Sequence, residues 1–343
     1  MSSDQEDMSP QAQSAQLDAA LAPATYPDIG SGKVPAAKKR RTTKAVETVA
    51  APTEEPPLQH PADAYVFRCV FPHGKLLATA MARAGSLCKS VVIDLTQADG
   101  LVIRQEDAFH VCRVSLELPK EAWLAWVVPR GGHVIVLFYE QLVSLAGLAG
   151  PEHSLTLYGL RDQQDYVWAR LHSTGKTERR YRLSCWPTDN LEDIAPVSHT
   201  TWPFPWRVRL PSRLFREEIS RCEAAKAGFA SFSVRGDGKL VLTTFPDELA
   251  RMPTTYDAAI PVTELVQPAA AEAAATAADA SLLVRFAVSF LSIIGKMDDM
   301  SSVLTLAGGL PDKPLVFTYP VPRPGAPEQT LGHITCMLMN KQD

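Results

Sequence analysis

The chain has 343 residues, of which 46% are hydrophobic and 21% charged, so its composition is that of a folded globular protein with room for about two domains. Its formal net charge of −4 excludes binding of nucleic acid through bulk positive charge, but not through cations gathered on one surface. The six cysteines are scattered without a Cys-x-x-Cys pair, which argues against a metal site or a disulfide framework.

Residues 1–61 have the composition of a disordered tail. They are rich in Ala, Pro, Ser, Thr, Gln and Glu and contain almost no aromatic residues. Lys38, Lys39, Arg40 and Arg41 form a basic cluster within this tail. Such a cluster can be a nuclear-import signal, a phosphate-binding arm or simply solvated charge. We expect no signal peptide, because the N-terminal stretch has no apolar run.

Patterns of ordered protein begin at Tyr65. Alternating apolar residues predict strands at 65–71, 91–95, 101–104, 110–118, 134–137, 155–160, 167–172 and 179–185. Helical spacing predicts helices at 75–87 and 139–149, and Asp99-Gly100 predicts a tight turn between two strands. The apolar segments 134–149 and 282–295 each contain a charge and are shorter than a bilayer requires, so we expect both in a core and no membrane association.

The second half of the sequence repeats this order. Strands are predicted at 206–210, 229–234, 239–244, 303–306 and 315–319, and helices at 212–227 and 286–297. We therefore expect two domains, 62–185 and 203–343, with a polar connector at 186–202. An Ala-rich stretch at 268–280 is predicted to be a surface insertion in the second domain.

Four segments carry a resemblance to a known family. They are LTQADGLVIRQEDAFHVCRVSLEL, HVIVLFYEQLVSLAGLAGPEHSLTLYG, VRLPSRLFREEISRC and the closing LLVRFAVSFLSIIGKMDDMSSVLTLAGGLPDKPLVFTYPVP. In order and spacing they resemble the DNA sliding clamps of the proliferating cell nuclear antigen (PCNA) family. The resemblance implies an α+β fold of two similar domains, each with two inner helices backed by antiparallel sheets. It implies a DNA polymerase processivity factor that encircles duplex DNA without reading its sequence.

Helical spacing places several cations on the predicted inner faces. Residues three or four apart share a face, so Lys75 and Arg83 lie opposite the leucines of the first helix. The third helix buries Phe215, Ile219 and Cys222, which leaves its arginines on the opposite side. Cations there neutralise phosphates without reading bases, although each could be an ordinary solvated side chain. The predicted DNA-binding residues are Lys75, Arg83, Arg213, Arg216, Arg221 and Lys296.

Some positions depart from the positive channel that the resemblance implies. The second helix offers Ser144 and Gly147 where the family usually has lysines, and Glu217 lies on the polar face of the third helix. Asp298 and Asp299 are predicted to be solvated at a helix end. We therefore expect weak, steeply salt-dependent affinity for duplex DNA.

The resemblance also implies a hydrophobic pocket beneath the connector, where a short helical segment bearing aromatic residues docks from polymerases and other replication and repair proteins. By position, the partner-binding residues are Val111, Leu191, Ile194, Pro196, Pro314, Met337, Leu338 and Met339. Glu106 and the pair Met339-Asn340 differ from the family pattern. The alternative is that these residues are core at a domain joint.

Clamps close into rings by pairing edge strands, normally as homotrimers. The first edge strand is predicted at Arg179–Ser184 and its partner near 250–256, where Pro253 disfavours pairing. The alternatives are a subunit of a heterotrimeric checkpoint clamp and a monomeric viral-type processivity factor. A clamp loader is a further implied partner, and the nucleus or a viral replication compartment is the implied location.

Catalysis is not expected. The sequence has no G-x-S-x-G, H-E-x-x-H, Walker or dinucleotide-binding motif, and its histidines are not grouped at metal-ligand spacings. We therefore predict no catalytic residues, no metal and no cofactor.

Overall fold

A computed structural model describes residues 58–174, 177–186, 202–235, 237–246, 256–266, 284–310 and 313–339. All of these residues belong to one compact unit, 48–343. The basic cluster of the tail, nearly all of the connector and the Ala-rich insertion lie outside the described residues, so the predictions for them stay predictions.

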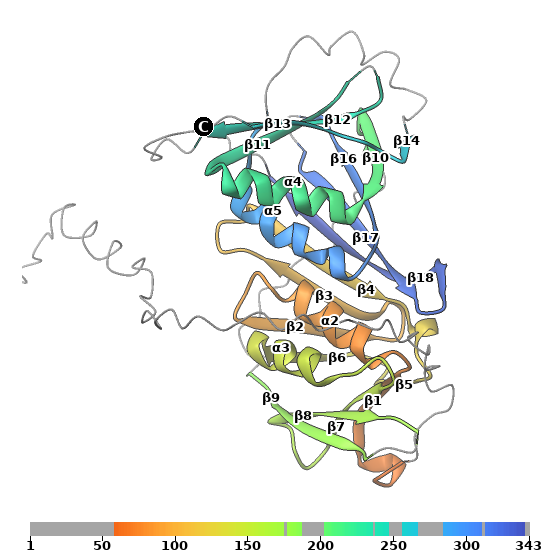
Figure 1. The fold of residues 1–343 in the computed structure, drawn as a ribbon. Helices are drawn as coiled ribbons and strands as arrows, with labels where there is room; N and C mark the ends of the chain where they lie inside the picture. The colour runs from red at the N-terminus through yellow and green to blue at the C-terminus, as the bar shows by residue number, and fades with distance from the viewer. Residues whose placement is uncertain are drawn as a thin grey trace, which may run out of the picture. The chain divides into compact units, whose positions relative to one another are not determined.

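The first half, residues 65–184, contains helices and strands close to those predicted (Figure 1). Its elements in chain order are β1 (Tyr65–Phe71), α2 (Gly74–Ala84), β2 (Ser90–Thr96), β3 (Gly100–Glu106), β4 (Cys112–Leu118), β5 (Ala125–Val127), β6 (His133–Phe138), α3 (Tyr139–Leu148), β7 (Ser154–Leu160), β8 (Tyr166–His172) and β9 (Arg179–Ser184).

The second half, residues 206–338, repeats this order. Its elements are β10 (Trp206–Pro211), α4 (Ser212–Ala224), β11 (Ala227–Val234), β12 (Leu240–Pro246), β13 (Asp257–Ile260), β14 (Glu264–Val266), β15 (Phe286–Ala287), α5 (Val288–Gly295), a 3₁₀ turn (Lys296–Asp299), β16 (Val303–Gly308), β17 (Leu315–Arg323) and β18 (Ala326–Leu338).

The order of strands in the sheets shows that the two halves of the chain have the same topology. The first half builds the orders β5-β1-β7-β8-β9 and β4-β3-β2-β6, and the second builds β14-β10-β16-β17-β18 and β13-β12-β11-β15. These orders are the same when each strand is matched to its counterpart. Within the chain, β18 pairs antiparallel with β4, which fuses one sheet from each half into a nine-stranded sheet. The α+β prediction is confirmed.

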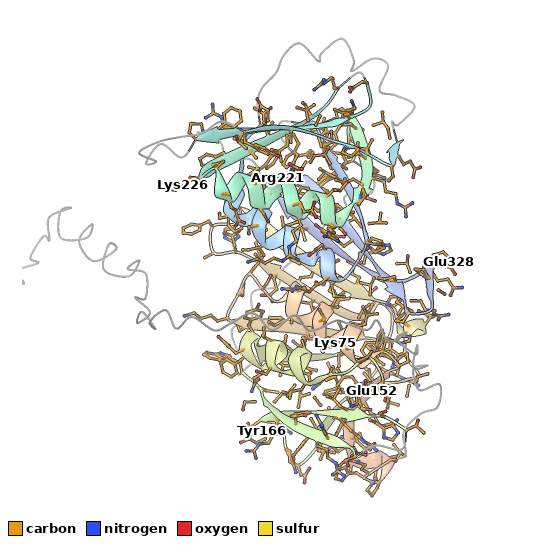
Figure 2. All side chains as sticks on the ribbon, in the orientation of Figure 1. Lys75, Glu152, Tyr166, Arg221, Lys226 and Glu328 are labelled. Atoms are coloured by element: carbon orange, nitrogen blue, oxygen red, sulfur yellow. The ribbon has the colours of Figure 1, made fainter. Side chains whose placement is uncertain are left out.

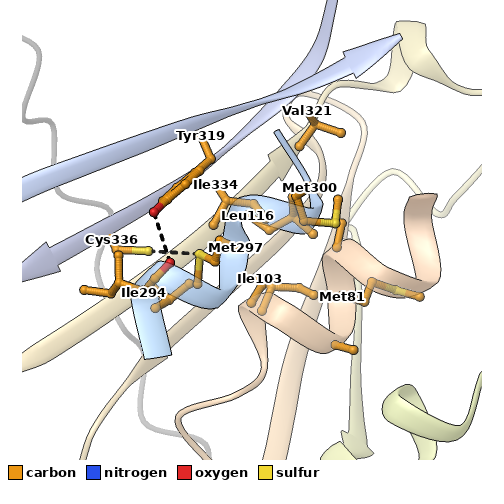
Figure 3. Packing of buried hydrophobic residues seen from close by; sticks show 14 of the residues in the cluster. Met81, Ile103, Leu116, Ile294, Met297, Met300, Tyr319, Val321, Ile334 and Cys336 are labelled. Carbon is orange, nitrogen blue, oxygen red and sulfur yellow. Dashed lines mark hydrogen bonds between the residues drawn. The ribbon is translucent and has the colours of Figure 1, made fainter. Parts of the chain in front are cut away.

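The four helices cover one face of this framework. Leu77 and Met81 of α2, and Phe215 and Ile219 of α4, are fully or almost fully buried in one continuous core. That core runs through the junction of the halves, where Met81, Leu116, Met297 and Ile334 lie together (Figure 3). Burial of such large apolar side chains supplies the main stabilisation of the fold.

A buried tyrosine fixes the end of α5 at this junction. The Tyr319 hydroxyl donates a hydrogen bond to the carbonyl oxygen of Ile294 at 3.0 Å, and the Cys336 thiol lies 3.4 Å from the Met297 sulfur (Figure 3). The Tyr319 ring is fully buried, so its hydroxyl needs this partner.

Two local predictions were wrong. His110 does not belong to a strand: its φ is +56°, in a turn that the Asp107 carboxylate organises. The predicted helix 286–297 is three elements, because it opens with β15 and ends in a 3₁₀ turn. The second edge strand was predicted near 250–256, of which only Tyr256 lies within the described residues, and β13 begins directly after this range at Asp257.

Candidate nucleic-acid and partner interfaces

The solvent side of α4 carries the densest group of charged residues on the helices. Phe215, Ile219 and Cys222 are buried, as predicted, so the opposite face is exposed. This face and the adjacent 3₁₀ turn form a shallow depression, and Figure 2 places Arg221 on it and Lys75 on the corresponding face of α2. The depression is lined by Arg213, Arg216, Glu217, Ser220, Arg221 and Asp298.

Four of the six predicted DNA-binding cations already form ion pairs. Within the second half, Arg216 pairs with Asp298 at 2.7 Å. Along α4, Arg213 pairs with Glu217 at 2.9 Å and Arg221 pairs with Glu218. The prediction that Asp298 is merely solvated was wrong, because its side chain is only 13% exposed against the arginine.

The fourth pair joins the two halves of the chain. Arg83 of α2 binds Asp299 through two nitrogens, with Nε 3.2 Å from both carboxylate oxygens. The hydrogen bond to Asp299 raises the pKa of the Arg83 guanidinium. Asp299 therefore also differs from the solvated acid that was predicted.

The helices as a group carry balanced charge. The six cations on α2, α4 and the 3₁₀ turn are matched by Glu140, Glu217, Glu218, Glu223, Asp298 and Asp299. Of the two cations without an ion pair named above, Lys75 donates to the carbonyl of Ala146 at 2.6 Å and Lys296 is exposed. Such a face attracts a polyanion only if phosphates displace its carboxylates.

Helix α3 is the neutral member of the set. Ser144 and Gly147 are exposed on it, and so are the apolar side chains of Val143 (44%) and Leu148 (42%). Its described residues contribute Glu140 and no cation.

The described docking residues lie near the ends of β4, β17 and β18 in the nine-stranded sheet. The Met339 N–H donates to the Val111 carbonyl at 2.8 Å, but Val111 packs against the main core and Pro314, just before β17, is buried. Met339 is 39% exposed, whereas Met337 is 8% exposed. Among Val111, Pro314, Met337 and Met339, only Met339 is exposed. Leu191, Ile194 and Pro196 lie outside the described residues.

Leu338 does not belong to this surface. Its side chain is completely buried in the main core, because alternate residues of β18 point to opposite faces. Two residues were missed instead: Phe204 and Trp202 pack with Met337 on the outer face. The aromatic alternation W-P-F-P-W at 202–206 was the available signal.

A rigid turn borders the same surface. The Asp107 carboxylate accepts hydrogen bonds from the backbone N–H groups of Phe109, Val111 and Cys112, and Phe109 is 83% exposed. Glu106 pairs with Arg113 at 2.7 Å. A charged pair therefore lies where the resemblance implied an apolar residue.

The described residues contain no group of three His, Cys, Asp or Glu side chains that could hold a metal ion. Burial raises the pKa of the Cys112 and Cys222 thiols to about 12, so neither supplies a thiolate near neutral pH. Across the described chain, every helix is too short or too polar for a bilayer span.

Comparison with known proteins agrees with the topology. No family model and no curated protein matches the sequence. Among solved structures, the PCNA2-PCNA3 complex from Sulfolobus tokodaii is similar with a TM-score of 0.62 and 16% identity, over 80% of this chain and 99% of that one. Proliferating cellular nuclear antigen from Entamoeba histolytica has a TM-score of 0.64 and 14% identity, over 81% of this chain and 100% of that one. The chain has the sliding-clamp fold.

Proposed function

We propose that this chain, which has the fold of the PCNA structures, is a divergent sliding clamp that encircles duplex DNA and carries partner proteins along it. The proposal rests on the internal repeat, in which each half of the chain has the same strand order and places two helices on the same face of the sheets. Cations on these helices would contact DNA phosphates, and phosphate contacts do not depend on the DNA sequence. A protein that slides along DNA needs contacts of this sequence-independent kind.

The sheet edges support assembly into a ring. Within the chain, β18 of the second half pairs with β4 of the first. Their counterparts, β9 and β13, each end a sheet in the described residues. Joining β9 of one copy to β13 of the next repeats the contact that the chain makes internally. Repetition of such a head-to-tail contact closes a ring when the rotation allows it, and we propose a homotrimer.

A ring of different subunits is the second candidate. One of the similar structures is a complex of PCNA2 with PCNA3, two distinct chains. A chain with this fold could therefore complete a ring with non-identical partners, as a checkpoint clamp does. Mass photometry of the purified chain separates the two: a homotrimer forms from this chain alone, and a heteromeric subunit does not.

Topological retention on DNA tests the proposal directly. Protein assembled on a nicked circular duplex should stay bound in salt that abolishes its binding to a short duplex. Cutting the circle once should release it, because a ring slides off a free end while an electrostatic contact does not. Retention that survives cutting would exclude encirclement. Release that needs no cutting would show that the ring never closes.

We further propose that the outer face around Met337 and Met339 docks helical segments of partner proteins. Met339 is the residue to change, since it is exposed, whereas a charge at buried Met337 would disturb packing. Met339→Asp or Ile194→Glu should abolish binding of a polymerase and its stimulation. Val127→Asp, at a 55% exposed apolar site on β5, is the matched control. Equal loss in the control, or none in either variant, would reject this surface.

A further inference from the structure

The junction inside the chain is a template for the junction between copies. In both halves the first residue of the first helix makes the same hydrogen bond to the residue just before a strand. The Gly74 N–H donates to the His153 carbonyl, just before β7, and the Ser212 N–H donates to the Ser302 carbonyl, just before β16. His153 and Ser302 are therefore equivalent positions. From this anchor, strand pairing fixes which residues of the two halves correspond.

The first correspondence concerns β9 and β18. From the anchor positions β7 and β16 continue in step, so Leu157, four residues beyond His153, is equivalent to Leu306, four residues beyond Ser302. The pairing then runs through β8 and β17 to the edge strands, and places Tyr181 of β9 at the position of Cys336 in β18. The ladders used are Leu157–Ala169–Tyr181 and Leu306–Phe317–Cys336.

The second correspondence concerns β13 and β4. Phe138 and Ala287 both immediately precede an inner helix, α3 and α5. They pair with Ser90 and Phe229, which sets β2 against β11. Pairing onward places Ala258 of β13 at the position of Leu116 in β4, through the ladders Ile93–Ile103–Leu116 and Phe232–Leu242–Ala258.

We propose that two copies join β9 to β13 in the register of the β18·β4 junction, so that Arg180 lies opposite Asp257 of the partner subunit. In the chain, Thr335 pairs with Ser115, and these are the positions equivalent to Arg180 and Asp257. The inference rests on the proposed ring and adds its register and its charge pair.

Charge complementarity supports this register. Arg180 is about half exposed, and its Nε lies 2.9 Å from Glu178, which also pairs with the buried Arg170. Asp257 is exposed at the start of β13. Placing Asp257 of the partner subunit beside Arg180 continues the alternation Arg170, Glu178, Arg180 across the interface. Opposite charges directly across two strands stabilise their pairing, and like charges oppose it.

The helices carry different residues at the junction between copies. Inside the chain, Arg83 and Asp299 join the two halves. The equivalent positions are Arg221 and Gly150, and the Glu152 carboxylate lies beside Gly150. Arg221 instead binds Glu218 of its own helix, and Glu218 accepts a hydrogen bond from the Tyr256 hydroxyl just before β13.

Charge reversal tests the pairing. Arg180→Asp alone and Asp257→Arg alone should each raise the dissociation constant of the assembly about tenfold or more, measured by mass photometry over a dilution series. The double variant should return it to within about threefold of wild type. Thermal unfolding of each variant separates loss of assembly from loss of fold, since Arg180 also contacts Glu178.

Arg182 provides the matched control for register. It lies on the same face of β9 two residues further on, is exposed, and stacks over the Tyr166 ring at 4.5 Å (Tyr166 is labelled in Figure 2). Arg182→Asp combined with Asp257→Arg should not restore assembly. Restoration by this pair, and not by Arg180→Asp with Asp257→Arg, would show a register shifted by two residues and overturn the proposal.

A disulfide gives a readout that does not depend on charge. The register sets Arg179 opposite Ala258 of the partner subunit, and directly opposed residues have Cα atoms about 4.5–5.5 Å apart, within reach of a disulfide. Arg179→Cys with Ala258→Cys should yield covalently closed oligomers on mild oxidation, where wild type gives none. A ring that forms yet neither cross-links nor responds to the reversals overturns the register and leaves the proposed clamp standing. A wild-type chain that stays monomeric overturns this register and the homotrimer, and leaves the ring of different subunits as the form of the proposed clamp.

Discussion

The helices of the two halves differ in charge although they occupy equivalent places. The pair α2 and α3 carries Lys75, Arg83 and one acid, and exposes apolar side chains on α3. The pair α4 and α5, with the following 3₁₀ turn, carries several charges of both signs that pair with one another. The exposed face of α2 and α3 therefore carries few charges, whereas that of α4 and the 3₁₀ turn carries many charges that neutralise one another.

The difference shows that the framework fixes the buried side of each helix and leaves the exposed side free to vary. Leu77 and Met81 of α2 have buried counterparts in Phe215 and Ile219 of α4. On the other side of the helices, Lys75, Thr79 and Arg83 of α2 stand where α4 has Arg213, Glu217 and Arg221, and none of these side chains is buried. The charge of the proposed DNA-facing side is therefore carried by residues that the packing of the core does not constrain.

The largest effect is expected where the first half does concentrate charge, on the outer face at Glu178. Burial alone would raise the pKa of Glu178, but hydrogen bonds from Arg170, Arg180 and Gln59 outweigh it and lower that pKa from 4.5 to about 2. A depressed pKa stabilises the fold above the ordinary pKa and loses this effect as pH falls toward the folded value.

Glu178→Gln should therefore lower the unfolding free energy by roughly 2 kcal/mol near pH 6, with the difference from wild type shrinking as pH falls from about 5 to 2. Urea unfolding at stepped pH measures both quantities. Glu264→Gln, at a 55% exposed residue 3.8 Å from Arg209, is the control and should show little change. A difference for Glu178→Gln that does not vary with pH would mean that its carboxylate charge is not the cause.

The second prediction would break the neutrality of the second half. Replacing Asp298 and Asp299 by Asn releases Arg216 and Arg83 for phosphates. Affinity for a short duplex should rise about tenfold, and the slope of log K against log salt should steepen by about 1.8, for two added phosphate contacts. Fluorescence anisotropy over a salt series measures both.

The control for this variant removes the same charge elsewhere. Asp162 and Asp237 are exposed in turns away from the helices. Asp162→Asn with Asp237→Asn should leave the salt slope unchanged. An equal gain in affinity would mean that net charge, and not release of the arginines, governs binding.

The features of the fold that depend on hydrophobic periodicity could be predicted from the sequence. The order of strands and helices, the repeat and the buried side of α4 followed from apolar residues at spacings of two and of three to four. The edge strand at Arg179–Ser184 is likewise present as β9. These features share one cause, since each requires a particular side chain to be buried.

Features that depend on partners distant in the sequence could not be predicted. Asp299 follows a helix like many solvated acids, and only the fold brings it to Arg83, 216 residues away. Leu338 was predicted to bind partners by its position in the family resemblance, together with Met337 and Met339, but strand alternation turns its side chain into the core. Phe204 and Trp202 were missed because the strand they cover comes from the far end of the chain.

The third prediction would make the first half resemble a positive channel. Ser144→Lys with Gly147→Lys adds two cations to α3, at exposed sites, and a Cβ at Gly147 meets no other atom within 4 Å. Affinity for duplex DNA should rise about fivefold with a steeper salt slope. Val127→Lys with Leu265→Lys, at exposed sites on β5 and β14, should have a smaller effect. If both variants gain equally, α3 does not face the DNA.

The smallest effect is expected at Glu217. It helps to decide whether the acids near α4 would weaken DNA binding through their total charge or through specific ion pairs with the arginines. Glu217 pairs with Arg213 along α4, but the arginine side chain is 84% exposed and the glutamate 43%. Water and salt already compete for so open a pair, which is worth a few tenths of a kcal/mol.

Glu217→Gln should therefore change duplex affinity by less than about twofold and leave stability within about 0.5 kcal/mol of wild type. The single change Asp298→Asn removes the same charge from a side chain that is 13% exposed, and should act more strongly. If the two variants bind DNA equally well, the acids act only through the sum of their charges. If Asp298→Asn alone improves binding, the fold keeps Arg216 from DNA by supplying a carboxylate that phosphate must displace.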